Sequence, residues 1–135
     1  MIITHSTFSL LVATIGLESS SYSVREDDLS INVTVILAHG ELGRDISFTF
    51  STQDGTALSP ADYAEVVVDP AIFPAGAMPG QVLIFTLPIV DDVLVEYDET
   101  FEVVLTTLDT AVEISIPTAN VTISNDDCKL VSKPL

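Results

Sequence analysis

Alternation of apolar and polar side chains is the feature that most constrains how this chain can fold. In the segment SINVTVIL, apolar residues from Ile31 to Leu37 alternate with the polar Asn32 and Thr34. The segments ISFTF, FEVVLTT and ANVTIS repeat this period of two. Because successive side chains of a strand point to opposite faces of a sheet, the pattern predicts strands with one buried face.

Seven strands are predicted in all, and no stretch has a helical period. They cover residues 20–26, 30–37, 46–50, 63–68, 81–90, 101–107 and 119–124. Turn-forming residues lie between them, at His39-Gly40, Asp54-Gly55, Pro70, Pro79-Gly80 and Pro117. Short strands at this spacing are typical of two packed sheets. We therefore expect an all-β fold, a seven-stranded antiparallel sandwich.

The charge balance excludes one class of function. The 135 residues include 20 acidic and 4 basic side chains, for a formal net charge of −16. Such a chain repels nucleic acid and anionic membranes, and it favours cations or basic partners. Cys128 is the only cysteine, so the chain can form neither an internal disulfide nor a thiolate zinc site.

Residues 8–17 form an apolar run, FSLLVATIGL, that is too short to span a membrane. It suits either the core of a signal peptide or, alternatively, a first strand or the trimmed edge of a longer chain. The second interpretation is preferred because no Lys or Arg precedes the run and no clear cleavage site follows it. Sequons at Asn32 and Asn120 favour an extracellular or cell-surface location. We expect residues 1–15 to be this N-terminal segment, 16–127 the domain and 128–135 a C-terminal tail.

The acidic residues gather at one end of the predicted sandwich. If neighbouring strands alternate in direction, the connections after the first, third and fifth strands and the end of the seventh lie at one pole. Twelve of the 20 carboxylates fall there: Glu26, Asp27, Asp28, Asp54, Asp62, Asp91, Asp92, Glu96, Asp98, Glu99, Asp126 and Asp127. The acids of the other pole are scattered and partly balanced by Arg44.

Such a gathering of carboxylates is stabilised by a hard divalent cation. Each close pair of like charges costs on the order of 1 kcal/mol in water. Calcium takes six to eight oxygen ligands in flexible geometry, whereas magnesium keeps its waters. Neither His5 nor His39 belongs to the acidic group, which argues against zinc, copper and iron. The sequence therefore predicts a Ca²⁺ site built from separate loops.

Four segments together resemble the Calx-beta domain. They are YSVREDD, FTFSTQDGTALSPADY, IVDDVLVEYDETFEVVL and ANVTISNDD, and they match in order and approximate spacing over about Gly16 to Asp127. The resemblance implies an immunoglobulin-like Greek-key sandwich with calcium at one tip. Members of this family occur as calcium-sensing regulatory domains of sodium–calcium exchangers and, often in tandem, in extracellular matrix, adhesion and receptor proteins.

The resemblance also implies a set of metal ligands. They are Glu26, Asp62, Asp91, Asp92, Glu96, Glu99, Asp126 and Asp127. Two positions depart from the members with the fullest acidic set, because Asn125 and Val93 stand where a further Asp can occur. Fewer charges imply fewer ions or weaker binding.

Other residues of the acidic pole receive structural interpretations. We expect Asp54 and Gly55 to form a turn with positive φ angles, and Tyr63 and Phe101 to anchor the core beside the site. Asp27, Asp28 and Asp98 are expected to lie near the ions without touching them or simply to be exposed. Paired carboxylates can serve as acid and base, but no nucleophile motif accompanies them. We therefore do not expect an enzyme.

The expected function is that of a calcium-binding module whose tip loops are ordered by Ca²⁺. Its partners would be calcium ions and neighbouring domains or other proteins, with no nucleic acid and no direct membrane insertion. The preferred setting is cell adhesion or extracellular matrix, in a secreted or membrane protein. Two alternatives remain open at this stage, a calcium-sensing regulatory domain of a membrane transporter and a metal-free structural sandwich.

Overall fold

The computed structural model describes residues 13–40, 43–93 and 97–125, and these form nine strands. The strands are β1 (Ala13–Leu17), β2 (Ser21–Arg25), β3 (Ser30–Gly40), β4 (Ile46–Asp54), β5 (Val67–Phe73), β6 (Val82–Pro88), β7 (Glu99–Thr106), β8 (Val112–Ile114) and β9 (Thr118–Ser124). A three-residue 3₁₀ helix, η1 (Glu26–Asp28), follows β2. None of the described residues belongs to a helix that could span a membrane.

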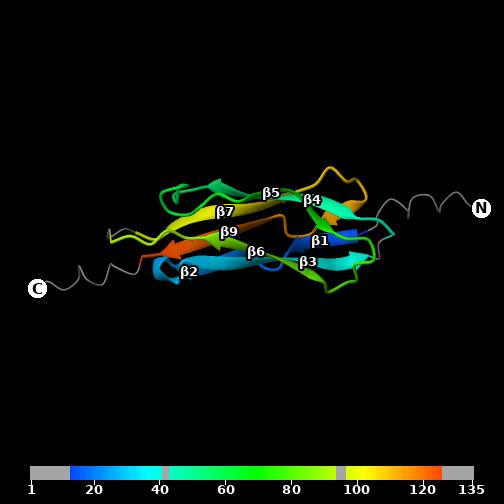
Figure 1. The fold of residues 1–135 in the computed structure, drawn as a ribbon, viewed down its shortest axis with the longest axis horizontal. Coiled ribbons are helices and arrows are strands. Elements are labelled where there is room, and N and C mark those ends of the chain that lie inside the picture. The colour runs from blue at the N-terminus through cyan, green and yellow to red at the C-terminus, as the bar shows by residue number, and fades with distance from the viewer. Residues whose placement is uncertain (1–12, 41–42, 94–96, 126–135) are drawn as a thin grey trace, which may run out of the picture.

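The strands form two sheets packed face to face, as Figure 1 shows. One sheet has the order β6-β3-β1-β8 and the other β2-β9-β7-β4-β5. Val33, Val35 and Leu37 are fully buried between the sheets, and so is Phe50 on the opposing β4. The all-β sandwich predicted from the alternating pattern is confirmed.

The strand predicted at residues 20–26 is β2, and β1 lies before it, within the apolar run 8–17 for which a strand was preferred over a signal peptide. These two strands belong to different sheets. β1 pairs with β3 in one sheet, and β2 pairs with β9 in the other. Ser19 stabilises the connection between them, because its Oγ accepts a hydrogen bond from Ser21 N at 3.2 Å and donates one to Ser21 O at 2.8 Å.

Two strand pairs are parallel, β1 with β8 and β2 with β9, so the expectation of purely antiparallel sheets is wrong at these pairs. The three-residue β8 was not predicted, because it is too short to show alternation.

The fourth predicted strand is displaced along the chain. It was expected at residues 63–68, whereas β5 covers Val67–Phe73 and includes Pro70. A proline is tolerated there because β5 is the edge strand of its sheet, and its register with β4 shifts between Phe48 and Phe50. Tyr63 instead makes an isolated bridge with Ile89.

Gly55 is required by a close backbone approach rather than by a turn angle. The expectation of a positive φ at this residue is wrong, because the described glycines with positive φ are Gly40, Gly76 and Gly80. A Cβ added at Gly55 would lie 2.5 Å from the carbonyl oxygen of Thr100, on the neighbouring β7. The backbone at residue 55 can lie this close to β7 only without a side chain.

We therefore expect Gly55→Ala to lower the free energy of unfolding by about 1–3 kcal/mol, because the added methyl group meets backbone. Urea unfolding followed by circular dichroism measures the change. Gly43→Ala is the matched control, since a Cβ there meets nothing within 4 Å, and it should shift stability by less than about 0.5 kcal/mol. Equal stabilities of the two variants would contradict the close approach.

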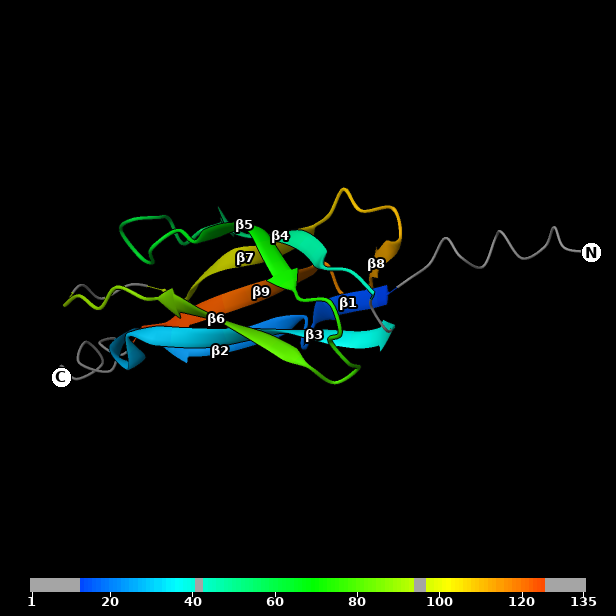
Figure 2. The same ribbon diagram turned by 45° about the vertical axis from the view of Figure 1, so that its right-hand side comes forward.

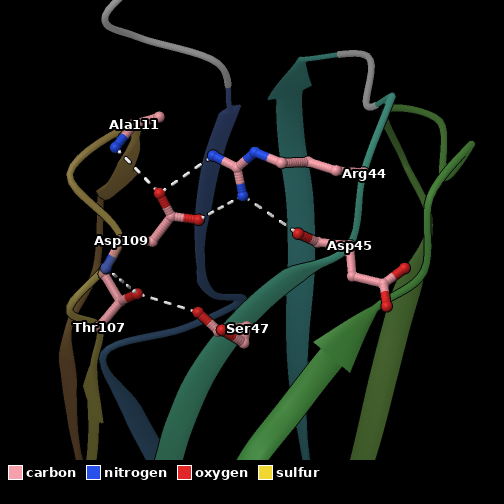
Figure 3. A network of polar contacts seen from close by, with 6 residues as sticks. All are labelled: Arg44, Asp45, Ser47, Thr107, Asp109 and Ala111. Carbon is pink, nitrogen blue, oxygen red and sulfur yellow. Dashed lines mark hydrogen bonds and ion pairs between the residues drawn. The ribbon is translucent and has the colours of Figure 1, made fainter.

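The pole opposite the predicted calcium site is held by an ion pair between two loops (Figure 3). Arg44 donates from Nη1 to Asp109 Oδ2 at 2.7 Å and from Nη2 to Asp109 Oδ1 at 3.1 Å. Beside this pair, Thr107 Oγ1 donates to Ser47 O at 2.9 Å. The hydrogen bond from Arg44 lowers the pKa of Asp109. Arg44 thus joins the β3–β4 and β7–β8 loops.

A lowered folded-state pKa means that Asp109 contributes stability above its ordinary pKa of 3.8, and that this contribution is lost as the pH falls through the lowered value. Arg44→Gln should therefore lower Tm slightly at pH 7 and have progressively less effect below about pH 4. Calorimetric scans at several pH values test this expectation. A pH-independent difference between Arg44→Gln and the parent chain would contradict it.

Candidate metal centre

Four chain segments meet at one end of the sandwich, as the alternation of strand directions predicts. The strand pairings align Arg25 of β2 with Ser124 of β9, and Glu99 of β7 with Ile123 of β9. In Figure 1 this end lies on the left, where β2 and β9 finish and the β4–β5 and β6–β7 connections turn. We call it the tip, and its described part comprises residues 25–29, 54–66, 89–93, 97–100 and 124–125.

Backbone hydrogen bonds connect three of these segments. Ile89 N donates to Leu29 O at 2.9 Å, and the next residue, Val90, donates from its N to Asp62 O at 3.0 Å. The chain after β6 is thus held between the β2–β3 turn on one side and the β4–β5 connection on the other. Asp91 follows immediately, so its position next to both segments is fixed by the fold.

Glu26 is the acidic residue of the β2–β3 turn that points into the protein. It opens η1 and is 5% exposed, whereas Asp27 and Asp28 are exposed. Asp27 forms a two-pronged ion pair with the guanidinium of Arg25, with both N–O distances 2.9 Å. Asp28 Oδ2 accepts from the backbone N of Arg25 at 3.0 Å and so closes the turn. These contacts direct Asp27 and Asp28 outward and leave Glu26 as the buried carboxylate of the turn.

Asn125 is a polar residue of the tip whose role the sequence did not reveal. It is 8% exposed, and its backbone N donates to Asp98 Oδ1 at 3.4 Å. The parallel pairing of Arg25 with Ser124 brings the ends of β2 and β9 together, and Glu26 and Asn125 are the residues that directly follow these ends. In the sequence Asn125 counted only as a missing Asp. Its amide oxygen is nevertheless a suitable calcium ligand, and its place directly after a strand that ends at the tip is the signal that could have identified it.

The remaining predicted ligands are distributed over the tip. Asp62, Asp92 and Glu99 are partly buried, and Asp91 is exposed. Asp62 Oδ2 accepts from Leu58 N at 2.9 Å, which orients this carboxylate. The other three, Glu96, Asp126 and Asp127, lie outside the described residues.

The described part of the tip does not form a metal site by itself. Across residues 13–40, 43–93 and 97–125, no group of three acidic, histidine or cysteine side chains lies close enough to hold a metal ion. The donors that the tip does offer are all oxygens, and its one described basic side chain, Arg25, is paired with Asp27. Buried oxygen donors with little competing positive charge fit a hard cation such as Ca²⁺. The predicted ligands outside the described residues would have to complete the set.

A stacked pair of aromatic residues lies in the core at the tip. The rings of Tyr63 and Phe101 stack with centroids 3.9 Å apart, and both residues are 1% exposed. The interpretation of these two residues as core anchors is confirmed. Tyr63 donates from its hydroxyl to Asp54 Oδ1 at 2.6 Å, and Asp54 Oδ1 also accepts from Ser59 N at 3.0 Å. Burial, together with the Asp54 hydrogen bond, raises the pKa of Tyr63. Asp54 thus holds the start of the β4–β5 connection against the core.

We expect Asn125→Asp to strengthen calcium binding by about tenfold, because it adds a carboxylate at the tip, directly after the paired ends of β2 and β9. Without calcium the same change should lower the free energy of unfolding by on the order of 1 kcal/mol through like-charge repulsion. Calorimetric titration and thermal melting with and without a chelator measure the two effects. If Asn125→Asp melts like the parent chain in the chelator and binds calcium no better, then residue 125 is not part of the site.

A comparison with known proteins agrees with this arrangement. The family model described as the Calx-beta domain matches residues 11–127. Among solved structures, an apo form of the Calx CBD1 domain is 28% identical, with a TM-score of 0.77 over 86% of this chain and 99% of that one. The CBD12 structure from CALX1.2 is 29% identical, with a TM-score of 0.74 over 84% of this chain and 45% of that one. The Calx CBD2 domain, at 16% identity, shares the fold with a TM-score of 0.71.

The search of curated proteins found no match. The family model spans most of the chain, and the structural matches at 28% and 29% identity support it independently. Calx-beta domains are non-catalytic modules, often calcium-binding. The chain belongs to the Calx-beta domain family.

Proposed function

We propose that this domain binds Ca²⁺ at the tip and that the bound ions order the loops there. The observation that carries the proposal is the meeting of three acidic connections with the end of β9 at the tip, where Glu26 is 5% exposed. Carboxylates gathered at one end of the fold repel one another. A cation shared between them and the amide oxygen of Asn125 would offset that repulsion.

A bound ion would replace electrostatic repulsion between the loops with attraction to a shared cation. Without it, carboxylates of the β2–β3, β4–β5 and β6–β7 connections repel one another across the tip. With it, they become ligands of one centre, which links segments that the backbone bonds of Ile89 and Val90 already hold nearby. The tip would then offer a stiff junction to a neighbouring domain or another protein.

Relatives support the metal assigned here. The solved structure of CBD12 of CALX1.1 is described as a calcium-binding domain, and it is 29% identical to this chain over 84% of its length. The match to an apo form of Calx CBD1 indicates that such a fold also forms without the metal. Calcium would therefore act on the tip loops rather than on the formation of the sandwich.

Calcium titration by calorimetry tests the assigned ligands. Glu26→Gln and Asp92→Asn should each weaken binding by about tenfold or more, because each removes a charged ligand. Glu113→Gln, on β8 at the opposite pole, is the matched control and should bind like the parent chain. Parent-like affinity in both tip variants would exclude these residues as ligands.

Calcium should also stabilise the fold, because only the folded chain assembles the site. At a free calcium concentration of about one hundred times Kd, the gain is about 2.7 kcal/mol. Thermal melting and protease resistance measured with calcium and with a chelator test this expectation. A Tm that is the same in both would leave a metal-free structural sandwich as the function.

For the biological setting we propose an extracellular or cell-surface module of adhesion or matrix, in which calcium is a permanent structural ion. The exposed sequon residues Asn32 and Asn120 support this setting. The likeness to Calx CBD1 favours the second candidate, a calcium-responsive regulatory domain of a transporter. A Kd of about 10⁻⁴–10⁻³ M would support the extracellular module, and one of about 10⁻⁷–10⁻⁵ M would support the sensor.

A further inference from the structure

We propose that β6 is an association edge, through which two copies of this chain pair as antiparallel strands into a symmetric dimer. The two sheets end in four edge strands, β6, β8, β2 and β5. In Figure 2, β6 lies at the front of the molecule alongside β3, its one partner in the sheet. The four edges differ in how well they are protected against pairing with another strand.

Three edges carry the features by which proteins discourage strand pairing. β8 is three residues long and contains Glu113. β2 is five residues long and ends in the charged Arg25. β5 has Asp69 and Pro70 at its centre. Short length, charge and proline each block an incoming strand.

β6 lacks these protections. Its seven residues, VLIFTLP, include no charged side chain, and its proline is the last residue. Ile84 is 59% exposed and Val82 is 39% exposed. A long, uncharged edge strand with exposed β-branched side chains is the kind of edge that another strand extends.

The backbone of β6 presents free pairing positions in a regular pattern. At the two ends of the β3–β6 pairing, Ile89 N donates to Leu29 O and Leu37 N donates to Gln81 O, each at 2.9 Å. In an antiparallel ladder the bonded pairs alternate, so the odd-numbered residues of β6 bond to β3. The N–H and C=O groups of Val82, Ile84 and Thr86 therefore point away from the sheet.

A second copy of the chain is the partner that these positions fit best. Under a two-fold axis, Ile84 lies opposite its own copy and Val82 lies opposite Thr86, so the residues whose backbones bond across the axis are all β-branched. A basic peptide would find no carboxylate on β6 to recognise, because the acidic tip begins only beyond this strand. The uncharged edge is where two chains of net charge −16 can approach with the least repulsion.

This charge gives the dimer a distinctive dependence on salt. Repulsion between the two acidic chains is screened over about 10 Å at 0.1 M salt and about 3 Å at 1 M. Association through β6 should therefore strengthen as the salt concentration rises. An interaction driven by opposite charges would weaken instead.

Sedimentation velocity of the chain over a concentration series, in chelator and at low and high salt, tests the proposal. We expect a monomer–dimer equilibrium that shifts toward dimer in high salt. Ile84→Lys should weaken dimerisation by roughly tenfold or more, because it places two like charges opposite each other across the axis. Ile72→Lys, at a 41% exposed position of β5, is the matched control and should dimerise like the parent chain.

Circular dichroism of both variants serves as the control that they are folded. A chain that remains monomeric at millimolar concentration in high salt would overturn the proposal. So would a dimer that survives Ile84→Lys or is lost equally in Ile72→Lys. The use of chelator keeps this result separate from calcium binding, so failure of one proposal leaves the other standing.

Discussion

Electrostatic repulsion between the carboxylates that converge at the tip is the main physical constraint on this structure. The sandwich places acidic connections at one end because strand directions require it, and two consecutive backbone bonds, from Ile89 and Val90, hold three of them together. Basic residues do not relieve this repulsion, because Arg25 is the only basic residue in the described part of the tip and it forms an ion pair with Asp27. The fold thus supplies the proximity, and in the proposed function a bound cation would supply the neutralisation.

The parts of the structure that the sequence predicted are those that follow from periodicity. Alternation located the buried faces of β3, β4, β7 and β9, and counting strand directions was enough to bring Glu26 and Glu99 to the same end. Both inferences depend on the two-residue repeat of a strand, which does not depend on tertiary detail. The stacking of Tyr63 on Phe101 could be anticipated in part, because aromatic residues next to turns commonly close the end of a core.

The parts that were missed depend on interactions between distant segments. Proline at position 70 signals a turn locally, and only the edge position of β5 makes it acceptable in a strand. The sequence indicates a turn at Gly55, yet a glycine is required there because of Thr100, on a different strand. Asn125 was undervalued for the same reason, because its place at the tip follows from the parallel pairing of β2 with β9, which brings the ends of these strands together. No local pattern encodes any of these three contacts.

The uneven placement of charge connects the tip with the edges of the sheets. Acidic residues are concentrated where the chain reverses at one pole, and a charged residue lies on three of the four edge strands. β6 is the exception, although nothing in the ladder with β3 requires it to be uncharged, because Val82, Ile84 and Thr86 face away from the core. Burial therefore does not explain its composition. An edge that is free to carry charge, in a chain this acidic, and yet carries none is better explained by contact with another strand than by solvent exposure.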